Sequence, residues 1–329
     1  MARVLIQGTV TKLLGGASSV DAGPDGVFTC DLRGRLFRKE GLRLAVGDRV
    51  AIAPADDAPG APGDPGEPGG VRRAVIEEVA PRRSALRRVR DFKRDQVLCA
   101  NVDRIFIVVA AVDPPYKRPF IDRLLVGAAR DELPTTLVVN KLDLAQDDDY
   151  LELIDEDLDV YARLGVPSLR VSATTGEGVE ALREALRDRI SAVVGPSGVG
   201  KSTLLNAVCP GLSLRTGEVS EVDGRGRHTT TAAELVRLPG GGFVIDTPGL
   251  RAFGLWDLQP DELLIGFQEI EEAAAGCRFT NCGHREEPGC AVRQAVEEGA
   301  VDPERYASFL KLRDEVEAEA ALRQATRRR

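Results

Sequence analysis

Residues 195–203 read GPSGVGKST and have the spacing of a phosphate-binding loop, Gly-x4-Gly-Lys-Ser. Glycines let backbone N–H groups crowd around phosphate oxygens, and a following helix adds its positive N-terminus. Lys201 is expected to reach the β- and γ-phosphates and to act in catalysis, and Ser202 to bind Mg²⁺. An apolar stretch typical of a β-strand (a β-run) precedes the loop, and a stretch typical of a helix (a helical run) follows it, as such a loop requires. The triphosphate-binding residues expected here are Gly195, Pro196, Ser197, Gly198, Val199, Gly200, Lys201, Ser202 and Thr203.

A second pattern, VVNKLDL at residues 138–144, favours GTP over ATP. Asp143 can accept hydrogen bonds from the ring N–H and the exocyclic amino group of guanine, a pair of donors that adenine lacks. Asn140 can bond to the base and steady its loop, and the stem of Lys141 can lie over the ring. A carboxylate left unpaired by adenine costs on the order of a few kcal/mol, which is enough for strong discrimination. With the SAT motif that ends a later β-run, the expected base-reading residues are Asn140, Lys141, Leu142, Asp143, Ser172 and Ala173.

The remaining nucleotide contacts are expected late in the chain, where residues 243–256 read FVIDTPGLRAFGLW. Asp246 ends an apolar strand and is placed to hold Mg²⁺ through water, while the N–H of Gly249 can sense the γ-phosphate. The loop before it, RGRHTTTAAE, brings three threonines of which one, taken as Thr230, would close over Mg²⁺. Thr229 and Thr231 remain alternatives, and the whole run can also be a turn or a strand edge.

A cluster of soft ligands, CRFTNCGHREEPGC, occupies residues 277–290. Its members Cys277, Cys282, His284 and Cys290 suit one tetrahedral Zn²⁺ with no open position, so the predicted role is structural. Two disulfides are the alternative, but they would leave the histidine unexplained. Cys30, Cys99 and Cys209 are expected to be ordinary thiols.

The elements that must position these residues change character along the chain. Residues 1–80 contain five short alternating stretches typical of a small barrel, for which the OB-fold is the commonest candidate. The expected strands lie in residues 3–13, 26–32, 33–39, 47–54 and 74–80. The Gly- and Pro-rich insert PGAPGDPGEPGG at residues 59–70 is expected to be a loop between two strands. From Val102 to about Phe253, β-runs alternate with helical runs, which predicts a parallel sheet covered on both faces. Ligands of such sheets bind at the carboxyl ends of the strands.

Composition limits the class of protein. The 329 residues are 43% apolar and 29% charged, as in a soluble globular protein, and no apolar run is long enough for a membrane helix. With six cysteines and no apparent export signal, a cytoplasmic location is expected. The net charge of −8 argues against wholesale coating of nucleic acid. Residues 72–94 nevertheless carry nine Arg or Lys against three acidic residues, which indicates either a solvated linker or a phosphate-contacting segment.

The order of these motifs resembles the circularly permuted GTPases, and closely the ribosome small-subunit-dependent GTPase A (RsgA/YjeQ) family. NKLD begins 55 residues before the phosphate loop, whereas in most GTPases it follows that loop. The resemblance covers essentially the full length and implies a GTPase of late small-subunit maturation that the subunit stimulates. The expected partners are the small ribosomal subunit with its rRNA and GTP or GDP, the cofactors are Mg²⁺ and one Zn²⁺, and the chain is expected to be a monomer without membrane contact.

The predicted fold is therefore an α/β P-loop GTPase domain, circularly permuted, flanked by an N-terminal all-β OB-fold barrel and a C-terminal helical zinc-binding domain. We expect the RNA-binding barrel at residues 1–84, the GTPase domain at 85–255 and the zinc domain at 256–329. The γ-phosphate-sensing segment would then lead directly into the last domain, a plausible lever for coupling a partner to nucleotide state.

The residue that orients the attacking water is not given by the usual motif. Many GTPases orient the attacking water with Gln after Asp-x-x-Gly, but here the residue is Leu250. We expect His228 to position water when the small subunit orders its loop, although a lone loop histidine can also be an exposed bystander. Two other functions remain open, namely a ribosome-binding module with a slow nucleotide switch and a small-molecule kinase. NKLD disfavours the kinase.

Overall fold

The computed structural model describes residues 4–32, 43–55, 72–90, 94–210, 233–246 and 260–327. The described residues belong to two compact units. One lies within residues 1–103, 186–192 and 220–250, and the other within residues 104–185, 193–219 and 251–329. None of the described helices combines the length and the apolar character needed to cross a membrane.

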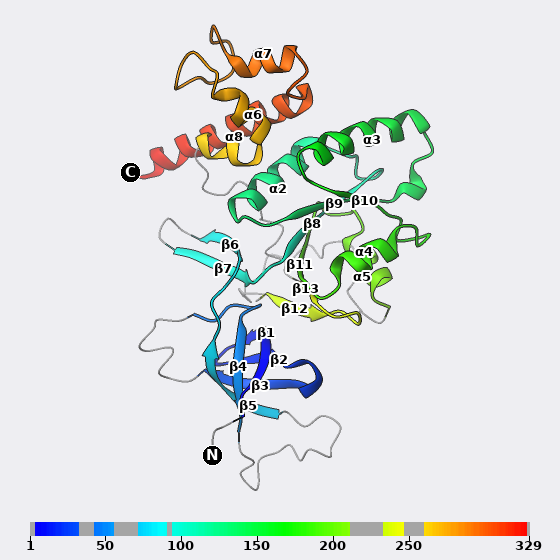
Figure 1. The fold of residues 1–329 in the computed structure, drawn as a ribbon, viewed down its shortest axis with the longest axis vertical. Coiled ribbons are helices and arrows are strands. Elements are labelled where there is room, and N and C mark those ends of the chain that lie inside the picture. The colour runs from blue at the N-terminus through cyan, green and yellow to red at the C-terminus, as the bar shows by residue number, and fades with distance from the viewer. Residues whose placement is uncertain are drawn as a thin grey trace. The chain divides into compact units, whose positions relative to one another are not determined.

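The first unit contains a closed five-stranded barrel (Figure 1). Its strands are β1 (Ile6–Leu14), β2 (Ala17–Asp21), β3 (Val27–Leu32), β4 (Arg49–Pro54) and β5 (Arg72–Val79). The order is β1-β2-β3-β5-β4, and β4 pairs again with β1, so that the barrel closes. Only the β3–β5 pair is parallel among these strands. Alternate side chains fill the interior, and the predicted OB-like barrel is confirmed; its buried core includes Val10, Val20, Phe28, Ile52 and Ile76.

The sequence patterns missed one strand of this barrel. β2 reads ASSVD, whose small and polar residues carry no strand signal, and it forms because β1 and β3 pair with it on either side. The stretch 33–39, expected to be a strand, lies outside the described residues. The insert at residues 59–70 also lies outside them, and the chain enters it after β4 and leaves it before β5, as the loop prediction requires.

The basic run is built into strands and is not a solvated linker. It covers β5, β6 (Ala85–Arg90) and the start of β7 (Arg94–Ala100), and β6 and β7 form an antiparallel hairpin. Arg82 is held by Asp48, a fully buried carboxylate 2.7 Å away. Arg72 lies over the ring of Phe28, 4.6 Å from its centroid. Part of the positive charge therefore stabilises the barrel.

The first unit also contains β12 (Glu234–Arg237) and β13 (Phe243–Asp246). Of β11 (Ile190–Val194), residues 190–192 belong to this unit. β13 runs parallel to β11 and antiparallel to β12. β12 also pairs with β1 of the barrel, where Lys12 Nζ donates to Glu234 across 2.7 Å.

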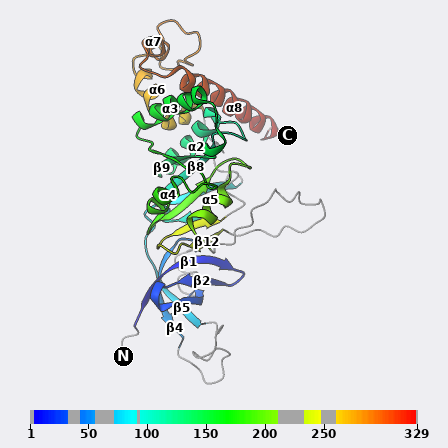
Figure 2. The same cartoon turned by 90° about the vertical axis from the view of Figure 1, so that its right-hand side faces the viewer.

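The second unit holds the parallel strands β8 (Arg104–Ala110), β9 (Thr135–Asn140) and β10 (Ser168–Arg170), ordered β8-β9-β10. Helices α2 (Arg118–Arg130) and α3 (Asp148–Arg163) lie along one side of these strands in Figures 1 and 2. α3 begins in a run of acidic residues, where the side chain of Asp147 accepts from the backbone N–H of Tyr150 and caps the helix. The unit also contains η3 (Leu142–Leu144), α4 (Val179–Leu186) and α5 (Lys201–Val208).

The end of the chain is helical, as predicted, and packs against α2. Its elements are η5 (Pro260–Gly266), α6 (Gln268–Ala274), α7 (Ala291–Glu297) and α8 (Pro303–Arg327). One apolar cluster joins them to α2, and its fully buried members include Val126, Leu263, Phe267, Val292 and Phe309. We call residues 260–327 the C-terminal module.

Candidate guanine-nucleotide site and metal centre

Asn140 is the residue that links the base-reading and phosphate-binding segments. It ends β9 and is 1% exposed. Its Nδ2 donates to the carbonyl of Val199 in the phosphate loop at 2.8 Å, and its Oδ1 accepts from the backbone N–H of Ala173 at 3.2 Å. One amide therefore joins the three segments that the sequence placed at a common site. Lys141 follows in a left-handed conformation, with φ 64°, which turns the chain sharply after the strand.

The carboxylate of Asp143 is oriented by a hydrogen bond from a buried serine. The Oγ of Ser172 donates to Asp143 Oδ1 at 2.6 Å and accepts from the backbone N–H of Thr175 at 3.0 Å. Ser172 is fully buried, whereas Asp143 is exposed. The carboxylate therefore has one oriented oxygen and remains accessible to a ligand with hydrogen-bond donors.

Lys141 has a partner that no motif predicted. Its Nζ donates to the backbone carbonyl of Asp113, in the loop between β8 and α2. The same loop is bound from α3, because Tyr150 Oη donates to the carbonyl of Ala111 at 2.8 Å. Residues 111–117 therefore lie against the candidate base-reading segment. The signal available in the sequence was only their position after a buried strand, where ligands of parallel sheets bind.

The phosphate loop requires its glycines for close contacts. A Cβ at Gly195 would lie 2.1 Å from the carbonyl oxygen of Val108, and one at Gly200 would lie 2.6 Å from Asn140 Nδ2. Gly200 also has φ 88°, which disfavours any side chain. The backbone can therefore adopt its curved path only with glycine at both positions.

Lys201 and Ser202 begin α5, directly after this loop. Lys201 Nζ donates to the carbonyls of Gly195 and Pro196 at 2.9 and 2.6 Å, so the ammonium lies over the loop. Ser202 is half-buried in the same first turn. An ammonium, a hydroxyl and backbone N–H groups at one helix N-terminus form a suitable environment for phosphate oxygens.

Several predicted residues are not described. His228, Gly249, Leu250 and the three candidate threonines, Thr229, Thr230 and Thr231, lie outside the described residues. Asp246 is the last residue of β13, where its backbone is opposite Glu234 of β12. Its place at the end of an apolar strand agrees with the sequence expectation.

The cysteine and histidine cluster is compact. The ligand atoms of Cys277, Cys282, His284 and Cys290 all lie within 4.8 Å of one another. His284 Nδ1 is 3.6 Å from the sulfurs of both Cys277 and Cys290. Tetrahedral bonds of about 2.3 Å to sulfur and 2.0–2.1 Å to nitrogen place two such ligand atoms about 3.6 Å apart, so the group fits a zinc ion. Burial, with the charge of Arg313, lowers the pKa of His284 and favours the neutral imidazole that binds metal.

The remaining cysteines take no part in this cluster. Cys30, Cys99 and Cys209 are buried in the barrel, at the end of β7 and after α5, as core thiols. Burial, with the nearby Asp31 carboxylate, raises the pKa of Cys30 to about 12, which keeps the thiol protonated and unreactive.

The chain order of these segments defines the class of protein. The base-reading segments at residues 140–143 and 172–173 precede the phosphate loop in sequence yet contact it through Asn140. This is the site of a circularly permuted P-loop GTPase.

Comparison with known proteins identifies the family. The RsgA GTPase family model matches residues 79–256, and the chain belongs to this family. The chain is 41% identical over 314 residues to the small ribosomal subunit biogenesis GTPase RsgA of Chlorobaculum parvum, covering 95% of this chain and 98% of that protein. It is 38% identical over 318 residues to the protein of the same name from Bacteroides fragilis, covering 95% and 97%.

Solved structures agree with this assignment. YjeQ from Thermotoga maritima matches with a TM-score of 0.74 and 36% identity, covering 95% of this chain and 99% of that one. YloQ, described as a circularly permuted GTPase, matches with a TM-score of 0.73 and 27% identity, covering 96% of each chain. The protein is thus a GTP hydrolase with a circularly permuted GTPase fold, an OB-like barrel and a C-terminal cluster suited to a metal ion.

Proposed function

We propose that this GTPase assists the biogenesis of the small ribosomal subunit, and that binding to the subunit stimulates hydrolysis of GTP. The curated relatives named for this role match over nearly their entire length, including the barrel and the C-terminal module. The observation that carries the proposal is the Asn140 side chain, which joins the base-reading and phosphate-binding segments into one site. The chain would act in the cytoplasm as a monomer, without membrane contact.

In the proposed site, guanine is read by residues 140–143 and 172–173. Asp143 accepts one base donor on each oxygen, while Ser172 also donates to Oδ1 and orients the carboxylate. The stem of Lys141 covers the ring, with its ammonium anchored at the Asp113 carbonyl. Leu142 begins the short η3 turn that carries Asp143. The N–H of Ala173, which donates to Asn140, would be shared with the guanine carbonyl.

The phosphates are bound by residues 195–203 and by the N–H of Gly249. Lys201 would exchange its present carbonyl partners for phosphate oxygens and neutralise the charge that develops during transfer. Ser202, Thr230 and Asp246 would hold Mg²⁺, because hydroxyl and carboxylate oxygens are the hard ligands that this ion prefers. Magnesium supplies Lewis-acid stabilisation of the phosphate charge when bound.

Hydrolysis is proposed to depend on His228. Leu250 cannot orient water, so His228 would do so when the small subunit orders the loop that carries it. Replacing His228 by Ala should reduce subunit-stimulated turnover by about 10²-fold or more, since positioned proton-transfer groups contribute about 10²- to 10⁴-fold. Affinity for GTP should be unchanged, as titration with a fluorescent GTP analogue would show. Unchanged stimulated turnover would rule out this role.

The C-terminal module, part of the proposed zinc domain at residues 256–329, is expected to bind about one Zn²⁺ as a closed structural site. Replacing Cys277 by Ser should remove most of the bound zinc, measured by elemental analysis, and lower the thermal stability of the module. Replacing Cys30 by Ser, a buried thiol in the barrel, controls for loss of any cysteine. Zinc that is absent from the unaltered protein, or fully retained after Cys277→Ser, would contradict the assignment.

Contact with rRNA is proposed for the barrel at residues 1–84 and the adjoining hairpin. OB-folds commonly bind nucleic acid, and Arg73 and Arg87 are exposed there. Few aromatic residues are present, so phosphate contacts are favoured over base stacking, and binding should weaken as salt rises. Residues 85–255 form the proposed GTPase domain, which includes this hairpin.

The direct test is co-sedimentation with purified small subunits in GDP and in a non-hydrolysable GTP analogue. We expect the chain to pellet with the subunits in the analogue and to remain largely in the supernatant in GDP. Large subunits provide the control for non-specific binding to RNA. Equal recovery with small and large subunits would contradict the proposal.

A further inference from the structure

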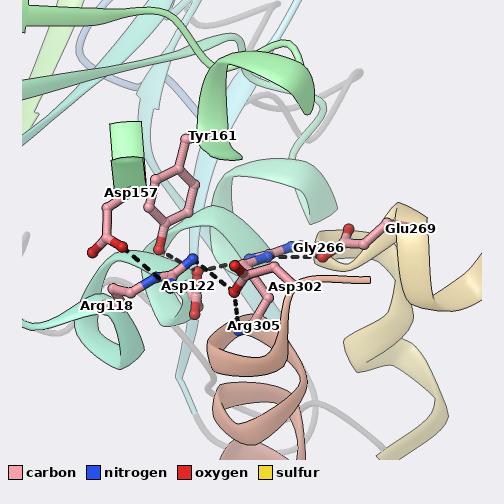
Figure 3. A network of polar contacts seen from close by, with 8 residues as sticks. All are labelled: Arg118, Asp122, Asp157, Tyr161, Gly266, Glu269, Asp302 and Arg305. Atoms are coloured by element: carbon pink, nitrogen blue, oxygen red, sulfur yellow. Dashed lines mark hydrogen bonds and ion pairs between the residues drawn. The ribbon is translucent and has the colours of Figure 1, made fainter. Parts of the chain in front are cut away.

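A buried arginine joins the C-terminal module to helix α2. Arg305, in the first turn of α8, is 1% exposed. Its Nη1 donates to Asp122 of α2 at 2.7 Å, its Nε to Glu269 of α6 at 2.8 Å, and its Nη2 to the carbonyl of Gly266 at 2.9 Å (Figure 3). One guanidinium therefore fixes α8, α6 and η5 against the second turn of α2.

The same network ties α2 to α3. Asp122 is fully buried, and its Oδ1 also accepts from Tyr161 Oη of α3 at 2.8 Å. Arg118, one turn earlier on α2, pairs with Asp157 of α3 at 3.2 Å and with Asp302 at 2.9 Å, just before α8 begins (Figure 3). The pair of helices and the start of α8 therefore share one set of buried charges.

Such a network fixes geometry more than it adds stability. Removing one partner leaves an uncompensated buried charge, which is strongly unfavourable, whereas apolar residues in place of both partners often stabilise a protein equally well. Arg305 is surrounded on three sides by acceptors whose directions match its planar fork. Displacing the C-terminal module from the α2–α3 pair would break the Arg305–Asp122 and Arg118–Asp302 contacts together.

The base reader lies next to the start of α2, which carries Arg118 and Asp122, and next to the start of α3. α2 starts directly after residues 111–117, whose Asp113 carbonyl accepts from Lys141. The first turn of α3 binds the same loop through Tyr150 and Ala111. The placement of the two helices therefore sets the position of the loop, and the loop holds the ammonium of Lys141.

We propose that Arg305 is a positioning residue for guanine recognition, which holds α2 and α3 so that Lys141 and Asp143 keep the geometry that binds the base. The inference rests on the proposed reading of guanine by residues 140–143. It makes the C-terminal module part of the guanine-binding half of the site. A partner that displaces α8 from α2 would weaken binding of GDP and GTP.

The test compares the affinities of Arg305→Leu for GDP and ADP with those of the unaltered full-length protein. GDP should bind about 2- to 30-fold more weakly, the range typical of residues that modulate coupling between sites. The affinity for ADP, which cannot use the Asp143 carboxylate, should change little. The preference for GDP, which is the ratio of the ADP and GDP dissociation constants, should therefore fall. The turnover rate at saturating GTP without subunits should stay within about twofold, because the phosphate-binding residues are untouched.

Two further variants separate positioning from stability. Val316→Ala removes buried volume from the same helix without touching a charge, and it should lower thermal stability while keeping the full GDP preference. Asp122→Asn keeps an oxygen that accepts from Arg305 and Tyr161 but removes the negative charge. It should lower the preference for GDP over ADP by a smaller factor than Arg305→Leu does. This milder change decides the matter if Arg305→Leu does not fold.

A preference for GDP that survives in the Arg305 and Asp122 variants would overturn the positioning role alone. An equal fall in the preference for GDP in Val316→Ala would also overturn the positioning role, because the effect would then follow from lower stability of the C-terminal module. An unaltered protein without a preference for GDP would instead overturn the proposed function, and this inference with it.

Discussion

Replacing Lys201 by Ala is expected to lower the rate of GTP hydrolysis by about 10²- to 10³-fold, the usual cost of removing one preorganised donor from a charge-developing transition state. The ammonium already lies over the phosphate loop, bonded to the carbonyls of Gly195 and Pro196. Alanine leaves the loop glycines in place but removes the positive charge that should face the β- and γ-phosphates. Single-turnover hydrolysis at saturating GTP measures the effect.

The matched control for this change is Lys311→Ala, which removes an exposed lysine from α8. Its turnover without subunits should equal that of the unaltered protein. Thermal stability should fall little in either variant, because Lys201 is not part of an apolar core. A Lys201→Ala protein with undiminished hydrolysis would show that residues 195–203 are not the catalytic phosphate loop.

Replacing Asp143 by Asn is expected to exchange guanine for xanthine specificity. The carboxylate offers two acceptors to guanine, whereas an amide presents a donor to the carbonyl that xanthine carries in place of the amino group. The amide oxygen can still accept from Ser172, so the loop should keep its shape. One charge-assisted bond of about 1.5–3 kcal/mol is lost, the second loses its charge, and the amide N–H opposes the amino group of guanine, so GDP should bind about 10²-fold or more weakly.

Competition between GDP and xanthosine diphosphate for a fluorescent nucleotide measures this exchange. Asp149→Asn, an exposed carboxylate in the first turn of α3, removes the same charge and should alter neither affinity. If Asp143→Asn kept tight binding of GDP, the base would have to be read elsewhere.

The nucleotide site was predictable because its parts are continuous motifs with fixed geometry. Asn-Lys-x-Asp and the phosphate loop each require certain residues at certain spacings, and parallel strands bring their carboxyl ends to one edge. The contact of Asn140 with Val199 follows from these two facts alone. The barrel was predictable in class but not in detail, since β2 carries no β-branched or aromatic pattern apart from Val20.

The network around Arg305 could not be predicted in the same way. Its members come from four helical elements and a turn far apart in the chain, and no spacing rule connects Arg305 with Asp122. One signal was present, because Arg305 is followed at helical intervals by the buried Phe309, Leu312 and Val316. An arginine on the apolar face of a helix indicates a buried partner but does not say where that partner lies.

The role of the basic run also depended on tertiary structure. Nine positive charges in a short stretch predict either a linker or a phosphate-binding surface, and sequence alone could not choose. Arg82 is held by Asp48 and Arg72 by Phe28, so these side chains support the barrel. Arg73 and Arg87 of the same segment are exposed, and the proposed contact with RNA is assigned to this surface.

The central claim is that the small ribosomal subunit controls hydrolysis at this site, and multiple-turnover GTP hydrolysis with and without purified subunits tests it most directly. We expect small subunits to stimulate turnover by more than about tenfold, since groups supplied or ordered by a partner accelerate other GTPases. Large subunits should have no effect, and Lys201→Ala should remove the stimulated rate. Turnover that is the same with and without small subunits would contradict the account.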